Sequence, residues 1–157
     1  MPNKPGVAPG SPTTRLGDWY ANVLFCRPQH LILCVSERTL LPLVIPAKPL
    51  ASLEQRLPLA ISELLTAFDI APDQVNTELR AMQPVAYGPT ANRRLLGTHN
   101  DLMYLLSVAI EDHPHESLLT RSLWLADTPC KPIGFSSPMR QTIELFASTT
   151  SRGNPLH

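Results

Sequence analysis

The fold is decided by residues 18–46, which read DWYANVLFCRPQHLILCVSERTLLPLVIP. Three apolar runs, at residues 19–26, 30–36 and 39–45, are separated by two short polar connections. Runs of this length between polar turn residues are typical of strands, and their close spacing favours an antiparallel meander. Pro42 has no N–H to donate to a neighbouring strand, so the third strand is expected at an edge of the sheet or with a bulge.

Beyond the third run, the chain changes to a helical pattern. Apolar residues recur at helical spacing in segments that begin near residues 52, 72, 98, 117 and 137. Ser52 and Gln55 have the spacing of a capping box, and Ser117 suits the N-cap of the fourth segment. Pro72 and Pro138 are expected at the first positions of their helices, where a missing N–H costs nothing.

The third helical segment, from residue 98 to residue 112, is apolar around most of its circumference. This pattern predicts a central, buried helix. Thr98 is expected to cap its N-terminus, which places Asp101 in the first turn. Because Arg93 and Arg94 are close in the sequence, we expect the Asp101 carboxylate to be buried and paired with one of them.

Strands followed by helices predict an α+β fold, in which a small antiparallel sheet, a three-stranded meander, packs with one face against four to five helices. Residues 15–147 are expected to form a single globular domain. Both ends of the chain are rich in small and polar residues. Residues 1–14 are therefore expected to be a flexible leader and residues 148–157 a flexible tail.

Composition disfavours several classes of protein. The 157 residues carry 13 basic and 13 acidic side chains, a formal net charge of zero, which disfavours a general nucleic-acid binder but not a local basic patch. No apolar run reaches the ~18–20 residues of a membrane span. The three cysteines show no metal-ligand spacing. We therefore expect a reduced, cytoplasmic protein with buried thiols and without a metal or cofactor.

The segment at residues 92–101, NRRLLGTHND, concentrates polar side chains beside a predicted helix start. In a functional interpretation, Arg93 clamps an anion and Asn92 or Asn100 orients it. Asp101 then acts as a base, or as the orienting partner of His99 in a proton shuttle. The structural interpretation, which the pattern favours, makes these ordinary turn and first-turn residues.

Two motifs give the chain a resemblance to a known family. The first is DWYAN at residues 18–22, and the second is N-R-x-x-L-G-x-x-N-D at residues 92–101. With a weaker match at residues 128–138, they resemble a widespread family of uncharacterised small bacterial proteins of unknown function. The resemblance implies a bacterial origin and a shared fold, and no established activity. Because Trp19 and Asn22 belong to the first motif, we expect a pocket where the two motifs meet.

Two functions are compatible with these observations. The first is a non-enzymatic binding or regulatory module, whose protein partner the sequence does not name. The second is an enzyme, or a binder of a small anionic ligand, acting at residues 92–101. Nucleic acid is a less favoured partner, and no membrane partner is expected.

Overall fold

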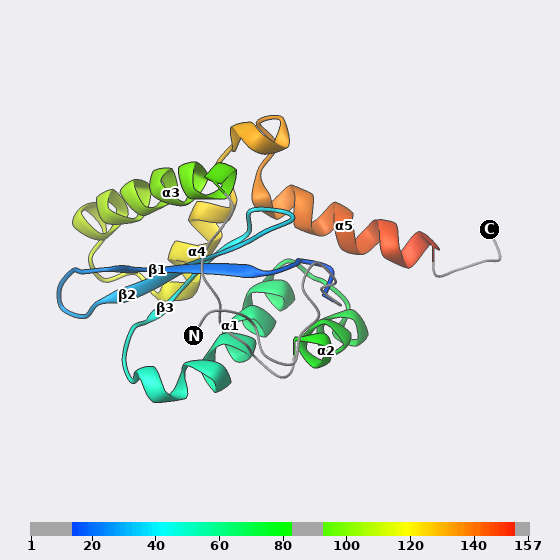
Figure 1. Ribbon diagram of the computed structural model, residues 1–157, viewed down its shortest axis with the longest axis horizontal. Coiled ribbons are helices and arrows are strands. Elements are labelled where there is room, and N and C mark those ends of the chain that lie inside the picture. The colour runs from blue at the N-terminus through cyan, green and yellow to red at the C-terminus, as the bar shows by residue number, and fades with distance from the viewer. Residues whose placement is uncertain (1–13, 83–92, 153–157) are drawn as a thin grey trace.

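The computed structural model describes residues 14–82 and 93–152. Within these ranges the chain forms three strands, five α-helices and two short 3-10 helices, which confirms the α+β class and the meander (Figure 1). The strands are β1 (Trp19–Leu24), β2 (Leu31–Ser36) and β3 (Pro42–Pro46). The helices are, in chain order, η1 (Leu50–Ser52), α1 (Leu53–Ala67), α2 (Pro72–Ala81), α3 (Arg93–Asp112), α4 (Leu118–Ala126), η2 (Lys131–Ile133) and α5 (Pro138–Arg152).

The sheet is antiparallel throughout, in the order β1-β2-β3. Leu33, near the middle of β2, lies opposite Asn22 of β1 and Val44 of β3. β3 is therefore an edge strand, as Pro42 predicts.

Helices cover both faces of the sheet, so that every residue of β2 is buried. Alternate side chains of a strand point to opposite faces. Ile32 and Cys34 pack into a core with α1 and α2, whereas Leu31, Leu33 and Val35 pack into a second core with α3. Figure 1 shows α3 on one side of the sheet and α1 and α2 on the other. The prediction of helices on one face is wrong, because β2 has apolar side chains on both faces and neither is suited to water.

Helix α4 packs along the free edge of β3 and contributes to both cores, through Leu125 on one side and Ala126 on the other. The Ser122 hydroxyl of α4 accepts a hydrogen bond from the Val44 N–H at 2.9 Å. The same hydroxyl donates to the Leu118 carbonyl at 3.0 Å. The edge of the sheet is therefore joined to α4 by a buried serine hydroxyl that both accepts and donates a hydrogen bond.

The prolines of β3 complete this arrangement. Because the Val44 N–H reaches Ser122, it points away from β2, and positions two residues away share that direction. Those positions are Pro42 and Pro46, which have no N–H. Within β3, Val44 thus carries the one outward N–H, and Ser122 satisfies it.

Replacing Ser122 with alanine is expected to lower the free energy of unfolding by about 1–3 kcal/mol, because a buried N–H loses its acceptor. Chemical denaturation followed by circular dichroism measures the change. Ser107→Ala is the matched control, since among the described residues the Ser107 hydroxyl bonds only to the Tyr104 carbonyl within α3. A change within about 0.5 kcal/mol is expected for the control. Equal effects of the two substitutions would contradict the role assigned to Ser122.

Most helices begin where local sequence signals place them. Pro72 opens α2 and Pro138 opens α5. Ser117 caps α4, because its hydroxyl accepts the Thr120 N–H at 3.0 Å. These three predictions are confirmed.

The capping box predicted for Ser52 and Gln55 is wrong. The Ser52 hydroxyl donates to the Pro49 carbonyl at 3.1 Å and accepts from Arg56 Nε at 2.9 Å. It makes no capping bond to the first turn of α1. Pro58 lies inside α1 without ending the helix.

Helix α3 begins earlier and lies nearer the surface than the sequence predicts. It starts at Arg93, so Thr98 is not its N-cap but a buried residue of its second turn. The buried side of the helix comprises Leu95, Thr98, His99, Leu102, Leu106 and Ala109. The opposite side comprises the exposed residues Leu96, Gly97, Asn100, Asp101 and Tyr104. The prediction of a central helix is wrong, because α3 covers one face of the sheet and leaves a full stripe in solvent.

A buried carboxylate ties the start of the described chain to α2. Glu78 is 1% exposed and accepts the backbone N–H groups of Arg15, at 2.9 Å, and Leu16, at 3.2 Å. Except for Thr14, the predicted leader lies outside the described residues. At the other end, α5 continues to Arg152, past the point where the sequence predicts that the tail begins.

Candidate functional site

The structure places two of the predicted site residues, Asn100 and Asp101, on the exposed side of α3. Arg93 is the first residue of the helix. Asn92 lies outside the described residues. The prediction that Asp101 is buried in a first turn is wrong, because α3 begins about two turns earlier and directs this position to solvent.

Trp19 and Asn22 point to opposite faces of the sheet, since they are three residues apart on β1. Trp19 packs against the core formed with α1 and α2. Asn22 is exposed on the face that α3 covers, and its Oδ1 accepts the Val23 N–H at 3.0 Å. The structure therefore brings Asn22, and not Trp19, to the side of the sheet where α3 lies.

His99 lies on the buried side of α3 and is 3% exposed. Its Nε2 has no hydrogen-bond partner among the described residues. Burial lowers the pKa of His99 below 6.5, because the imidazolium loses its hydration, and the nearby Leu33 backbone opposes this effect. Asp101 lies on the other side of the helix and does not orient the ring, since residues two apart do not face each other.

The lowered pKa of His99 predicts that the protein loses stability in mild acid. The unfolded chain binds a proton more readily than the folded chain. The contribution of His99 is therefore complete above its unfolded pKa of 6.5 and declines as the pH falls towards its folded pKa. The free energy of unfolding is expected to fall by up to about 1.4 kcal/mol per pH unit below 6.5.

Chemical denaturation between about pH 5 and pH 7.5 measures this slope. His99→Gln should flatten the profile, whereas His113→Gln, at an exposed position, should leave it unchanged. Identical slopes for the His99 variant and the unmodified chain would exclude His99 as the source.

The three cysteines are free thiols in different environments. Burial raises the pKa of Cys34 to about 12. Cys130 is also buried, and burial together with the nearby Asp101 carboxylate raises the pKa of its thiol. Cys26 is only half-buried, which differs from the prediction of a buried thiol, because it follows the end of β1 in the β1–β2 connection.

Under native conditions, a thiol reagent such as dithionitrobenzoate is expected to modify Cys26 and to leave Cys34 intact until the chain unfolds. The reason is that reaction needs both access and the thiolate form. Mass spectrometry of proteolytic fragments identifies the modified residue. Cys26→Ser should remove the early reaction. Equal rates for Cys26 and Cys34 would contradict the burial of β2.

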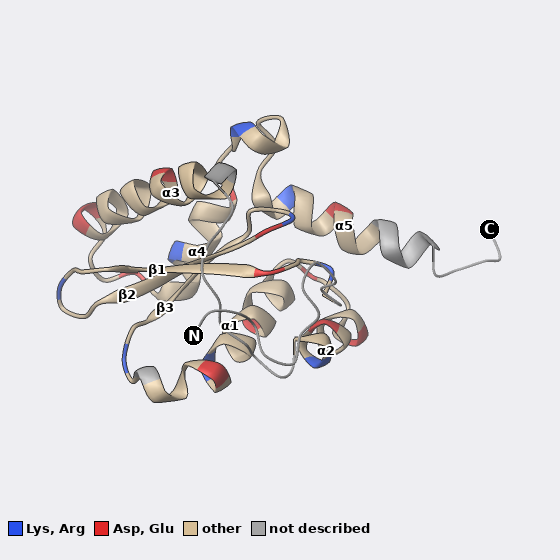
Figure 2. Cartoon of the chain, viewed as in Figure 1, with Lys and Arg blue, Asp and Glu red and all other residues tan. Residues whose placement is uncertain are grey.

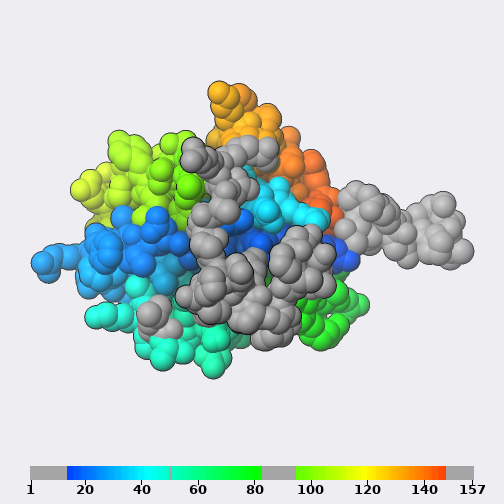
Figure 3. Space-filling model, viewed as in Figure 1, coloured from blue at the N-terminus to red at the C-terminus, as the bar shows by residue number. Residues whose placement is uncertain are grey.

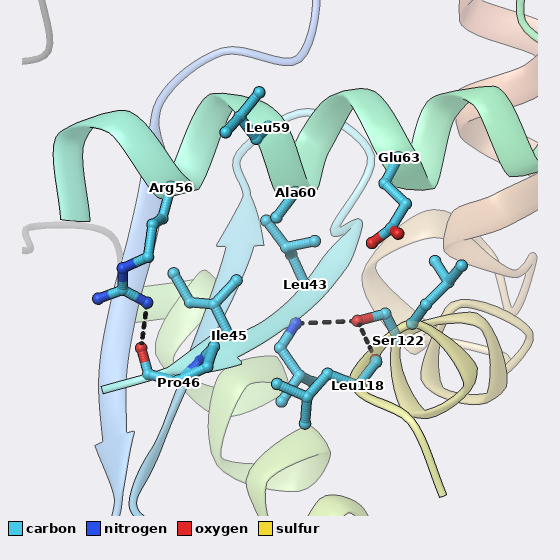
Figure 4. Close-up of a pocket in the computed structure, with 11 residues that line it drawn as sticks. Leu43, Ile45, Pro46, Arg56, Leu59, Ala60, Glu63, Leu118 and Ser122 are labelled. Atoms are coloured by element: carbon cyan, nitrogen blue, oxygen red, sulfur yellow. Dashed lines mark hydrogen bonds between the residues drawn. The ribbon is translucent and has the colours of Figure 1, made fainter. Parts of the chain in front are cut away.

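A groove of about 290 Å³ lies between α1 and α4, with β3 as its floor (Figure 4). Its lining is mainly aliphatic and comes from three elements: Leu43 and Ile45 of β3, Leu59 and Ala60 of α1, and Leu118 of α4. Leu59 is 69% exposed. The groove therefore presents apolar side chains to solvent between two helices.

The two ends of the groove carry opposite charges. At one end, the Arg56 guanidinium donates to the carbonyls of Pro46, at 2.8 Å, and Pro49, at 2.6 Å. Its Nε donates to the Ser52 hydroxyl at 2.9 Å, so all three nitrogens serve to hold the β3–α1 connection. At the other end, Glu63 is exposed, and no hydrogen bond or ion pair joins it to any described residue. Figure 4 shows its carboxylate directed from α1 towards the α4 side of the groove.

Sequence reasoning missed this groove because its walls are far apart in the chain. One signal was present. Leu59 does not belong to the apolar stripe of α1, whose buried members are Ile61, Leu64 and Leu65. A leucine outside the buried stripe of an amphipathic helix is an apolar side chain that the core does not bury.

These features define a small α+β domain, with a three-stranded antiparallel sheet between helices and an apolar groove at one sheet edge. The chain belongs to the family described as Domain of unknown function (DUF6933), whose model matches residues 1–141. No curated protein and no solved structure matches the chain. The expectation of an uncharacterised domain family is thereby confirmed.

Charges of both signs are distributed over several elements rather than gathered on one (Figure 2). Among the residues that the structure describes, no helix combines the length and the apolar character that a membrane span requires.

Proposed function

We propose that this domain is a non-enzymatic binding module that docks a short apolar segment of a partner protein in the groove between α1 and α4. The observation that carries the proposal is the aliphatic groove itself, with Leu59 exposed beside it. Covering an exposed leucine is a favourable contribution to association, of about 1.5–3 kcal/mol when burial is complete.

The size of the groove suits side chains rather than a cofactor. Pockets for small-molecule ligands usually measure about 300–1,000 Å³. At about 290 Å³, this groove lies at the lower limit of that range. One or two leucine-sized or isoleucine-sized side chains of a partner fit such a volume.

The charges at the groove determine which residues of the partner are favoured next to its aliphatic side chains. Three of the five N–H groups of Arg56 donate to acceptors of its own chain, so Arg56 has less capacity than Glu63 to bind a partner. Glu63 has no partner among the described residues. The favoured ligand therefore carries a lysine or arginine next to its aliphatic side chains, where it pairs with Glu63.

The proposal is tested by selecting binders to the full chain from a displayed library of random heptapeptides. The expected consensus is one or two aliphatic residues beside a lysine or arginine, with dissociation constants in the micromolar range for so small a contact. A selection without a consensus, or with an acidic one, would count against the proposal.

Matched variants connect the selected peptides to the groove. Ala60→Phe fills the groove and should weaken binding about tenfold or more, corresponding to about 1.4 kcal/mol. Ala67→Phe makes the same change at an exposed position of α1 that does not line the groove, and should leave binding unchanged. Glu63→Gln should reduce the preference for a basic residue and retain the preference for aliphatic ones. Peptides that bind the Ala60 variant as well as the unmodified chain would disprove this site.

We also propose a bacterial, cytoplasmic setting and a single globular unit over residues 15–147. The three free cysteines support a reducing compartment, and the sequence motifs support the bacterial origin. An anionic ligand at residues 92–101 has less support, because Asp101 is exposed there and is itself negatively charged.

A further inference from the structure

We propose that a cavity between the β1–β2 connection and the β3–η1 connection binds a phosphate group, either as the free ion or as the monoester of a small molecule. The cavity measures about 200 Å³ and is lined by Pro28, Gln29, His30 and Lys48. None of these residues lines the groove between α1 and α4, so the inference is independent of the proposed function.

The two connections that form the cavity carry basic side chains and no acidic ones. Residues 25–30 read FCRPQH and residues 47–49 read AKP, and Figure 2 shows basic residues on both connections. Lys48 is exposed, and no hydrogen bond or ion pair joins its ammonium to any described residue. The cavity therefore has an ammonium available to an anion and no carboxylate in its lining that would compete for it.

The imidazole ring of His30 is held in place on one face by an aromatic side chain. Phe25 is 76% exposed, yet its ring meets the imidazole edge-on, with centroids 5.1 Å apart and planes at 75°. Edge-to-face packing of this kind is a favourable arrangement of aromatic rings. The exposed phenylalanine thus serves to fix the orientation of the histidine.

The contacts of Nδ1 make Nε2 of the same ring a donor. Nδ1 lies 3.1 Å from both the amide nitrogen and the carbonyl oxygen of Cys26. A neutral ring whose Nδ1 accepts the Cys26 N–H carries its hydrogen on Nε2. A protonated ring donates from Nδ1 to the Cys26 carbonyl and again carries a hydrogen on Nε2. In both forms the ring nitrogen that Cys26 does not occupy donates, as an anion requires.

Main-chain contacts fix the two sides of the cavity relative to each other. The Ala47 N–H donates to the His30 carbonyl at 3.0 Å, so the residue before Lys48 is joined to the histidine itself. The Arg56 guanidinium donates to carbonyl groups on either side of this Ala-Lys pair. The backbone that carries both donors is therefore in place before a ligand arrives, which reduces the cost of binding.

The size of the cavity and the directions of its donors favour a phosphate group. Pockets for whole small-molecule ligands usually measure about 300–1,000 Å³, so a cavity of about 200 Å³ suits a single group. Lys48 and His30 approach from different connections, and a tetrahedral phosphate offers an oxygen to each. Figure 3 shows the β1–β2 connection, in blue, projecting at the surface, which leaves space for the rest of a monoester in solvent.

Nuclear magnetic resonance of the full chain, titrated with inorganic phosphate at constant pH and ionic strength, tests the proposal. Saturable shifts of the Gln29, His30 and Lys48 amide signals are expected, with a dissociation constant of about 1–10 mM because exposed charged contacts are weak. Acetate should bind at least about fivefold more weakly, since it carries a single charge and a phosphate group about 1.5–2. Phenyl phosphate is the monoester probe: tighter binding than inorganic phosphate supports a monoester as the ligand, and weaker binding supports the free ion.

Matched variants connect the shifts to the cavity. Lys48→Gln should weaken phosphate binding about fivefold, and Lys131→Gln, which removes the same charge at an exposed position outside the cavity, should leave it unchanged. His30→Asn ends near the position of Nδ1 and should weaken binding, whereas His30→Gln reaches towards the position of Nε2 and should retain more of it. The melting temperature of each variant, followed by circular dichroism, shows that the fold is intact.

Three results would overturn the proposal. The first is the absence of saturable shifts at the cavity. The second is an equal loss of binding in the Lys48 and Lys131 variants, which would indicate a general attraction of anions to positive charge. The third is binding of acetate as tight as that of phosphate, which would exclude the phosphate group as the ligand. Because Lys48 is exposed, its variant keeps the test decisive even where a substitution of His30 disturbs the β1–β2 connection.

Discussion

Burial of β2 on both faces is the constraint on which the rest of the structure depends. Five of its six residues are apolar, and their side chains alternate between two cores. A sheet of three strands cannot cover itself, so it requires helices on each side. Helix α3 supplies one layer, and α1 with α2 supplies the other. Helix α4 packs at the edge of β3, where it contributes apolar residues to both cores.

The sequence predicts those parts of this arrangement that have local causes. The antiparallel meander depends on short connections, the edge position of β3 on Pro42, and the start of α4 on a serine that caps it. Each of these signals acts within a few residues. The placement of helices on the two faces of the sheet has no local cause, because the β2 sequence LILCVS is the same whether helices cover one face or both. Its lack of any alternation with polar residues was the available sign of burial on both faces.

Helix α3 shows why a count of apolar residues does not locate a helix in a fold. Met103 and Leu105 lie at the flanks of its buried stripe and are half-buried, while Leu96 is exposed. A helical pattern therefore looks apolar all round although one side is in solvent. Thr98 has the chemistry of a cap, but the helix continues through it because the arginines and leucines at residues 93–96 favour a helix.

The candidate sites differ in how far sequence alone leads to them. Asn100 and Asp101 attract attention as polar neighbours beside a helix, but their exposure appears only once α3 is known to begin at Arg93. The groove joins α1 to α4, which are adjacent only in the folded chain. Its acidic end depends on a single carboxylate, Glu63, and that no described residue pairs with it is a property of the tertiary structure.

The edge of β3 has a further consequence for recognition. Proteins that accept a peptide at a strand edge usually bind its main chain by extending the sheet. Here Pro42 and Pro46 offer no N–H, and Ser122 occupies the one that Val44 offers. The neighbouring groove is therefore expected to bind a peptide mainly through its side chains. An edge strand without a free backbone N–H also disfavours joining of this sheet to that of another molecule.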